Sequence, residues 1–218
     1  MRTLDTGGLV HIEPVPGGTS KWYYGISHAC GDLYEAEEIF NSGRELRGRR
    51  LCFVSYPEGS VYEPVPVKQG AYFSEPVYAD GGICFLNVDF SQARMQILRF
   101  DCAEHGVEPV TELPLNAVRD CYNLGLDIAP LTLRRQGGAD GLFEIIWPER
   151  VSFPLGEHES FFLREGDRLF FSRWHEEGEG ADYRYWEETV VRDLNGEIRE
   201  ILPGDVRIMP NGELWYLK

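Results

Sequence analysis

The densest group of reactive side chains lies in the segment from Gly25 to Asp32, where Ser27, His28 and Cys30 stand close together. A helix that starts after this segment would place its free N–H groups beside Cys30, and such groups lower the pKa of a thiol and bind anions. With His28 as its base, Cys30 could then act as a nucleophile. The alternative is a turn of small residues capped by Asp32, and the absence of a nucleophile motif around the cysteine favours it.

A second segment whose residue types could bind a ligand runs from Trp174 to Trp186, where four aromatic rings and four carboxylates occur in thirteen residues. Aromatic faces beside carboxylates can bind sugars, cationic groups or a basic peptide. The residues that we expect to contact such a ligand are Trp174, His175, Glu177, Tyr183, Tyr185 and Trp186. The spacing matches no calcium loop, and we expect no metal. The alternative is a long hairpin loop whose aromatic residues belong to the flanking strands and whose acids face water.

A group of basic residues follows the segment from Gly25 to Asp32. Arginine occupies four of the seven positions from Arg44 to Arg50, and such a group could bind phosphate or a carboxylate. Glu45 stands among these arginines, so we favour a solvated loop that pairs with the acidic surface.

The elements that would position these residues follow an internal repeat. Short β-like runs that end in proline recur along the chain. Their markers are Pro16, Pro66, Pro114, Pro154 and Pro203. Proline suits the end of an edge strand because it has no N–H to donate to a ladder. A second set of repeat markers, at similar intervals, consists of the expected turn glycines Gly31, Gly81, Gly125, Gly166 and Gly212.

Tight turns join the short runs within each unit. The turn signals are Asp80-Gly81-Gly82, Asn195-Gly196 and Asn211-Gly212, and Asn-Gly is a strong hairpin signal because both turn residues need positive φ. Four-stranded units at this repeat length are typical of propeller blades. We therefore predict an all-β fold made of four-stranded antiparallel meanders, most simply a five-bladed β-propeller that forms a single domain over 1–218. An irregular β-sandwich or an open array of meanders is the alternative.

The ends of the chain suggest how such a ring could close. The expected units are 17–66, 67–114, 115–154, 155–203 and a last unit that combines 204–218 with 1–16. Only two strands are expected after Pro203, and the N-terminal run from Leu9 to Pro16 ends in the same motif as the others. Pairing of that run with the C-terminal strands would remove an open sheet edge.

One segment departs from the β pattern. Between Asp32 and Gly43 the chain offers an N-cap aspartate, Glu35 at the capping-box position and apolar residues at helical spacing. We predict a short helix near 33–42.

A propeller would also define a place for a ligand, at the starts of the innermost strands around the central channel. In this register those positions are Trp22, Glu75, Asp120, Glu159 and Asp205. Carboxylates there could form the acid and base pair that glycoside hydrolysis requires. Acids at strand starts are also ordinary solvated residues, and no pair among them is singled out by its local sequence.

Composition narrows the classes of partner. The 218 residues carry a net charge of −15, which argues against nucleic acid and anionic membranes as partners. The N-terminus has no apolar stretch typical of a signal peptide, and the five cysteines are odd in number and show no metal-binding spacing. These features predict a cytoplasmic protein with reduced thiols and no cofactor.

Together the patterns favour a non-enzymatic binding module that presents a loop face to a protein or a small polar ligand. The alternative is a glycosidase-like hydrolase that uses carboxylates at the channel mouth. The sequence leaves open whether the protein is an enzyme, the identity of the ligand and the oligomeric state.

Overall fold

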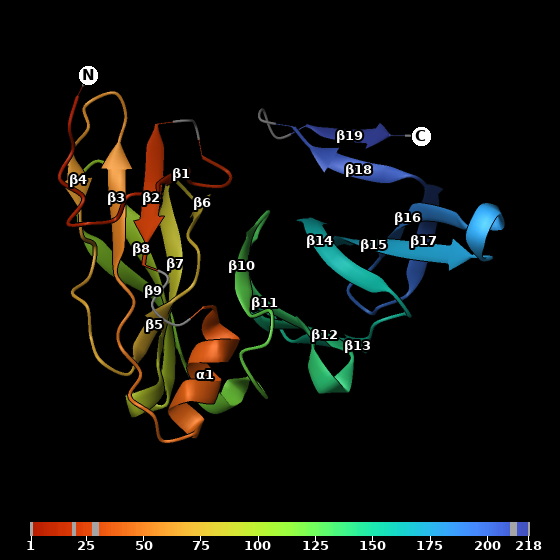
Figure 1. Cartoon of the computed structure of the whole chain (residues 1–218), viewed down its shortest axis with the longest axis horizontal. Coiled ribbons are helices and arrows are strands. Elements are labelled where there is room, and N and C mark those ends of the chain that lie inside the picture. The colour runs from red at the N-terminus through yellow and green to blue at the C-terminus, as the bar shows by residue number, and fades with distance from the viewer. Residues whose placement is uncertain (1, 19–20, 28–30, 210–212, 218) are drawn as a thin grey trace. The chain divides into compact units, whose positions relative to one another are not determined.

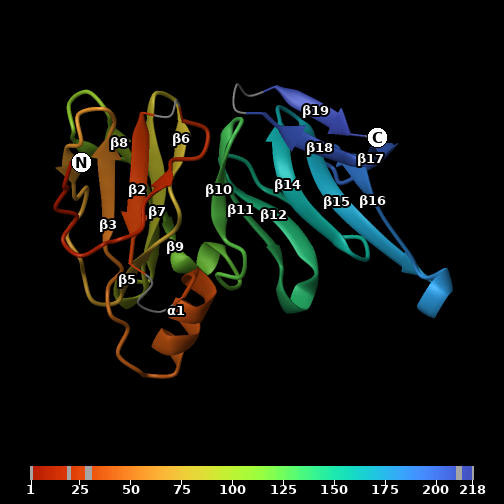
Figure 2. The ribbon, with the colours of Figure 1, turned by 45° about the horizontal axis from the view of Figure 1, so that its top comes forward.

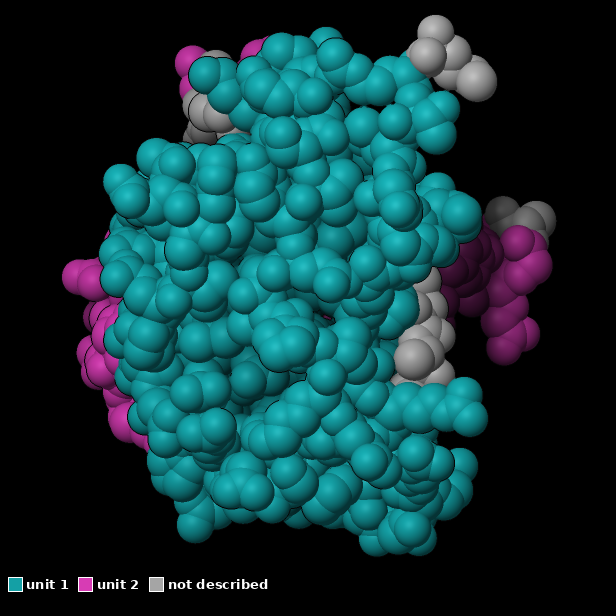
Figure 3. Space-filling model, turned by 90° about the vertical axis from the view of Figure 1, so that its left-hand side faces the viewer, with its two compact units in different colours: residues 1–131 teal, residues 132–218 magenta. Residues whose placement is uncertain are grey.

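The computed structural model describes residues 2–18, 21–27, 31–209 and 213–217. These residues form antiparallel β-sheets and one α-helix (Figure 1), which confirms the all-β prediction. The chain divides into two compact units, 1–131 and 132–218, which are coloured separately in Figure 3.

Two sheets build most of the first unit. One has the order β1-β2-β3-β4, with β1 at Glu13–Pro14, β2 at Trp22–Ile26, β3 at Leu51–Ser55 and β4 at Val61–Tyr62. The other has the order β5-β7-β8-β9, with β5 at Ala71–Phe73, β7 at Gly82–Asp89, β8 at Arg94–Asp101 and β9 at Val107–Pro114, while β6 at Val77–Ala79 also pairs with β7. The turn from β6 to β7 uses Asp80 and Gly81, both with positive φ, as a tight hairpin requires.

Aromatic side chains join these two sheets face to face. Tyr24 and Phe53 point from the first sheet into a core that contains Phe85 and Phe100 of the second. The ring centroid of Phe53 lies 5.8 Å from that of Phe85 and 5.1 Å from that of Phe100. Because side chains alternate along a strand, the residues between these positions face away from this core.

The predicted helix is present as α1, Leu33–Asn41, and its capping box is complete. The Asp32 carboxylate accepts a hydrogen bond from the Glu35 backbone N–H at 2.9 Å, and the Glu35 carboxylate accepts one from the Asp32 backbone N–H at 2.9 Å. Leu33 and Ala36 form the buried face of the helix.

A third sheet has the order β10-β11-β12-β13, and the division between the units falls at the first residue of β11. Its strands are β10 at Gly125–Ile128, β11 at Leu131–Gly137, β12 at Leu142–Trp147 and β13 at Val151–Pro154. A fourth sheet has the order β14-β15-β16-β17, with strands at Glu159–Glu165, Arg168–Glu177, Arg184–Arg192 and Ile198–Pro203. The last two strands, β18 at Asp205–Ile208 and β19 at Leu214–Leu217, pair with each other.

The second unit repeats the face-to-face packing of the first. Phe143 and Phe153 pack on Phe161 and Phe171 of the fourth sheet, with 4.9 Å between the ring centroids of Phe143 and Phe161. A smaller core on the other face of the fourth sheet includes Phe170 and extends to Leu214 of β19. Short 3₁₀ turns, η1 to η4, lie at Phe90–Gln92, Leu115–Ala117, Gly138–Asp140 and Gly180–Asp182.

Three of the five proline markers are the final residues of edge strands, whereas Pro16 and Pro66 lie outside the strands, so their assignment as strand ends is wrong. Pro114, Pro154 and Pro203 end β9, β13 and β17, the outermost strands of their sheets. This agrees with the expectation that proline stands where no ladder hydrogen bond is needed. The glycine series is less uniform: Gly166 lies in the β14–β15 turn with φ of +59°, but Gly125 is the first residue of β10, so its assignment as a turn residue is wrong. Gly212 lies outside the described residues.

The N-terminal strand differs from its expected place. Glu13 pairs with Tyr24 and Pro14 with Tyr23, so β1 is the edge strand of the first sheet. Its assignment to the last unit is therefore wrong for the described residues, because a short connection leads straight from β1 back along β2 and favours local antiparallel pairing. The five-bladed ring and the single domain stay predictions.

The described part of the chain holds no helix with the length and apolar character needed to cross a membrane.

Candidate functional site

The strands β15 and β16 form a hairpin that extends beyond the rest of its sheet (Figures 1 and 2). The two strands pair as far as Glu177 opposite Arg184. The neighbour β14 begins at Glu159, opposite Arg173, and β17 ends at Pro203, opposite Glu188. Residues 174–187, which we call the outer hairpin, therefore have no flanking strand on either side among the described residues.

The outer hairpin corrects the expected loop. Most of the segment from Trp174 to Trp186 is paired strand, and only residues 178–183, which include η4, connect the strands. Gly178 and Gly180 take φ values of +78° and +57°, which allow the chain to reverse here. Trp174, Tyr185 and Trp186 thus lie in the strands, as the alternative interpretation expects, whereas Tyr183 lies in the connection.

One face of the hairpin carries a stacked histidine and tryptophan. His175 pairs in register with Trp186, and their rings lie nearly parallel at 12° with centroids 5.0 Å apart. Glu188 lies beside them, with its Oε1 2.8 Å from Nε2 of His175 and 2.7 Å from Nε of Arg173. Burial by itself would raise the pKa of Glu188, but the hydrogen bonds from His175 and Arg173 outweigh it and hold the pKa below its ordinary value.

The opposite face carries tyrosines hydrogen-bonded to carboxylates. The Tyr183 hydroxyl donates to Glu176 at 3.0 Å, and the Tyr185 hydroxyl donates to Glu187 at 2.5 Å. These hydrogen bonds to carboxylates raise the pKa of both tyrosines. Each of these hydrogen bonds holds a carboxylate charge next to the ring of its tyrosine.

Trp174 is on that second face and is packed from outside the hairpin. The ring of His158 stacks on it with centroids 3.6 Å apart and an angle of 30° between the planes. Trp174 is half-buried as a result, whereas Trp186 remains 43% exposed. Trp186 is therefore the more accessible of the two tryptophans.

The outer hairpin exposes rings and negative charge together. Tyr183 and Tyr185 are about half exposed. The exposed acids of this region are Glu176, Glu177, Glu179, Asp182 and Glu187, and Arg184 is the basic residue that accompanies them. Exposed aromatic faces beside uncompensated carboxylates attract cationic groups through both charge and cation–π interactions.

Glu159 is next to this surface but has a different character. It begins β14, as expected for an inner-strand position, and its side chain is fully buried. Both carboxylate oxygens accept hydrogen bonds from Nη2 of Arg192, at 2.9 and 3.0 Å, and the Gly156 backbone N–H donates at 2.7 Å. The charge of this carboxylate is therefore balanced by Arg192 inside the second unit.

The remaining expected site residues have separate local environments. Trp22 packs into the first core, with 5.6 Å between its ring centroid and that of Phe100. Ser27 accepts a hydrogen bond from the Arg50 backbone N–H at 2.8 Å. His28 and Cys30 lie outside the described residues.

Two of the three other strand-start acids are displaced from strand starts. Glu75 is exposed between β5 and β6, and Asp120 precedes β10 and accepts a hydrogen bond from the Tyr122 backbone N–H at 3.0 Å. Asp205 does begin β18, where it forms an ion pair with Arg207 at 2.7 Å.

The arginine cluster divides into solvated and buried members. Arg44 and Arg47 are exposed, in agreement with the expected solvated loop. For Arg49 that interpretation is wrong: it is 5% exposed, donates to the carbonyls of Ser27 and Phe73 at 3.1 and 2.8 Å, and lies over the ring of Tyr72. Backbone carbonyls that converge from distant strands hold this cation inside, and burial lowers the pKa of its guanidinium.

One cavity was not anticipated from the sequence. It lies in the first unit, and the side chains around it include Arg2, Tyr23 and Tyr56. The available signal was the Tyr56-Pro57 turn directly after an apolar strand, but nothing in the local sequence connects it with Arg2.

A scan of the chain against protein-family models found no matching family, and a search of the curated proteins found no match either.

Proposed function

We propose that this protein is a non-enzymatic binding module that uses the outer hairpin to hold a basic partner, most simply a lysine- or arginine-rich peptide segment. The observation that carries the proposal is the joint exposure of Tyr183, Tyr185 and Trp186 beside five carboxylates on a hairpin with two free edges. Aromatic residues dominate binding hot spots, and carboxylates steer a cation toward them.

The arrangement supports binding over the hydrolase alternative. Glu159, the best-placed candidate acid, is closed off by Arg192 and the Gly156 backbone N–H. The carboxylates of the outer hairpin are exposed, whereas a general acid at neutral pH depends on burial to raise its pKa.

The wider architecture that we propose is a propeller-like stack of meanders in the cytoplasm. Its support is the repeated face-to-face packing of antiparallel sheets, in the core of each unit, and free thiols at Cys52, Cys84, Cys102 and Cys121. An experimentally determined structure that lacked a ring of blades would exclude the propeller. Disulfides in protein purified from its native cells would exclude a reducing compartment.

The binding proposal can be tested with a fluorescein-labelled peptide of alternating lysine and glycine, followed by fluorescence anisotropy. We expect it to bind in low salt and to weaken as salt screens the carboxylates. A peptide with glutamate in place of lysine should not bind. Trp186→Ala should weaken binding by roughly tenfold or more, because a central ring is a typical hot spot.

A matched control distinguishes this surface from exposed rings in general. Trp215 is 51% exposed on β19, so Trp215→Ala removes a comparable ring outside the outer hairpin and should leave the affinity unchanged. Glu177→Gln should weaken binding, whereas Glu104→Gln, at an exposed acid in the first unit, should not. Equal effects of Trp186→Ala and Trp215→Ala, or binding of the glutamate peptide, would exclude the outer hairpin as the site.

A further inference from the structure

The first unit contains a cavity of about 390 Å³ on the face of the β1–β4 sheet that points away from the aromatic core. Tyr23 and Val54 are paired neighbours on β2 and β3, and both line this cavity, whereas Tyr24 and Phe53 belong to the core on the other face. A volume of this size falls within the range of small-molecule sites.

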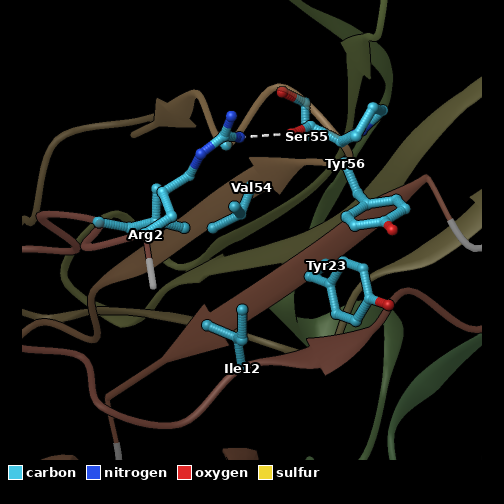
Figure 4. Close-up of a pocket in the computed structure, with 9 residues that line it drawn as sticks. Arg2, Ile12, Tyr23, Val54, Ser55 and Tyr56 are labelled. Atoms are coloured by element: carbon cyan, nitrogen blue, oxygen red, sulfur yellow. Dashed lines mark hydrogen bonds between the residues drawn. The ribbon is translucent and has the colours of Figure 1, made fainter.

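The walls of the cavity are apolar and partly aromatic (Figure 4). Ile12 and Val54 form the aliphatic part, and the rings of Tyr23 and Tyr56 meet edge to face with centroids 6.4 Å apart. Tyr56 is 61% exposed and stands at the rim, so its ring is available to a ligand. Such walls would accommodate a ligand whose apolar part is aromatic or branched aliphatic.

The N-terminal segment closes one side of the cavity and is tied down at several points. Nη1 of Arg2 donates to the carbonyls of Pro57 and Glu58, at 2.5 and 2.7 Å. Gly59 permits this approach, because a Cβ at that position would lie 2.9 Å from a methyl of Leu4. Further along, Arg50 donates to the Thr6 carbonyl at 2.9 Å. The segment thus rests on the sheet as part of the fold.

Arg2 is the charged residue among those that line the cavity, and half of its guanidinium is unused. Nη1 makes both of the hydrogen bonds to the turn, while Nε and Nη2 have no partner within the described parts of the chain. These two atoms form the edge of a guanidinium that pairs with a carboxylate through two parallel hydrogen bonds. An apolar cavity with one such edge at its rim selects for an amphipathic anion.

We propose that this cavity binds a small carboxylic acid with an aromatic or branched aliphatic body. The apolar body would occupy the space between Val54 and the rings of Tyr23 and Tyr56, and the carboxylate would pair with Arg2. This site lies in the first unit and takes a ligand of opposite charge to the partner of the outer hairpin, so it does not depend on the proposed function.

The test compares 3-phenylpropionate with its neutral amide, titrated into the full-length protein and followed by isothermal calorimetry. We expect the acid to bind at least tenfold more tightly than the amide, because only the acid forms the charged pair. Nuclear Overhauser effects from the ligand should reach the ring of Tyr56 and the methyls of Val54. Equal affinities, no binding at millimolar concentration, or ligand contacts confined to residues outside the cavity would overturn the proposal.

Two variants test separately the charge pairing by Arg2 and the apolar contact with Tyr56. Arg2→Gln should abolish the preference for the acid while leaving the weak binding of the amide, and Tyr56→Ala should weaken both ligands. Arg44→Gln, at an exposed arginine of the same unit, is the matched control and should change neither. If Arg2→Gln keeps the acid preference, or Arg44→Gln removes it, the charge pairing assigned to Arg2 is wrong.

Discussion

Glu159 and Arg192 are 33 residues apart in the sequence, yet both oxygens of the buried Glu159 carboxylate accept hydrogen bonds from the Arg192 guanidinium. The arginine joins the start of β14 to the end of β16 and lies within 5.8 Å of the ring of Phe153. This ion pair is therefore embedded in the aromatic core of the second unit.

Glu159→Gln should reduce the free energy of unfolding by about 3 kcal/mol, because it leaves the charge of Arg192 buried without a counter-charge. Urea denaturation would measure the loss. Glu157→Gln, two residues earlier, removes a carboxylate whose side chain is 89% exposed and should have no measurable effect. Peptide binding by the folded Glu159→Gln protein should persist, and its disappearance with the fold intact would reassign Glu159 to the functional surface.

A pH-dependent contribution to stability comes from Asp89, which is 2% exposed at the end of β7. Burial by itself would raise the pKa of Asp89, but hydrogen bonds from Lys68, Ser91 and the Gln92 backbone N–H outweigh it and lower the pKa. A pKa that is lower in the folded state stabilises the protein above the unfolded value of about 4, and this stabilisation is lost as the pH falls through the folded pKa.

Asp89→Asn should therefore be destabilising at neutral pH, by about 1–3 kcal/mol, and the difference from the wild type should shrink below about pH 4. Chemical denaturation at a series of pH values would show this convergence. Asp167→Asn, at an exposed turn residue, serves as the control and should follow the wild type throughout. A difference that stays constant into acid would mean that the charge of Asp89 does not contribute.

Local features of the fold could be predicted because their causes are contained in a few neighbouring residues. The capping box of Asp32 and Glu35 specifies where α1 begins, and Asn195-Gly196 marks the turn between β16 and β17, although Gly196 takes a positive φ there and Asn195 does not. The pairing of β1 could not be read in the same way, since it involves only Glu13 and Pro14. Two residues carry too little pattern to select a partner strand.

For the candidate sites too, the sequence predicts only those clusters whose residues are close together along the chain. The rings and acids of the outer hairpin are close in sequence, so their cluster was visible before the structure. The cavity around Arg2 and Tyr56 brings together residues more than fifty positions apart, and the burial of Arg49 depends on carbonyls from Ser27 and Phe73. Contacts over such separations arise from tertiary packing, which leaves no mark on the local pattern.

The capping box offers a direct test of helix α1. Asp32→Ala should lower the free energy of unfolding by about 1 kcal/mol, since it removes the acceptor for the Glu35 backbone N–H. Asn41→Ala, at the exposed last residue of the helix, is the matched control and should be close to neutral. Shifts in the urea midpoint would report both changes. An Asp32→Ala protein as stable as the wild type would show that the helix start does not depend on this cap.

The buried cysteines should resist modification in the folded protein. Burial raises the pKa of Cys84 and of Cys102 to about 11, and burial together with the neighbouring Glu37 carboxylate raises that of Cys121 well above the ordinary value. Because the thiolate is the reactive form, these groups should react slowly with maleimide at pH 8.

A Cys30→Ser variant removes the cysteine outside the described residues and leaves four thiols to be counted by mass spectrometry. We expect Cys102 to be modified first, because it is the one of the four that is only half-buried. In guanidinium chloride all four should react promptly, which controls for the chemistry of the reagent. Rapid modification of Cys84 in β7, or of Cys121 in the segment before β10, under native conditions would mean that these parts of the chain open far more readily than the packing around them implies.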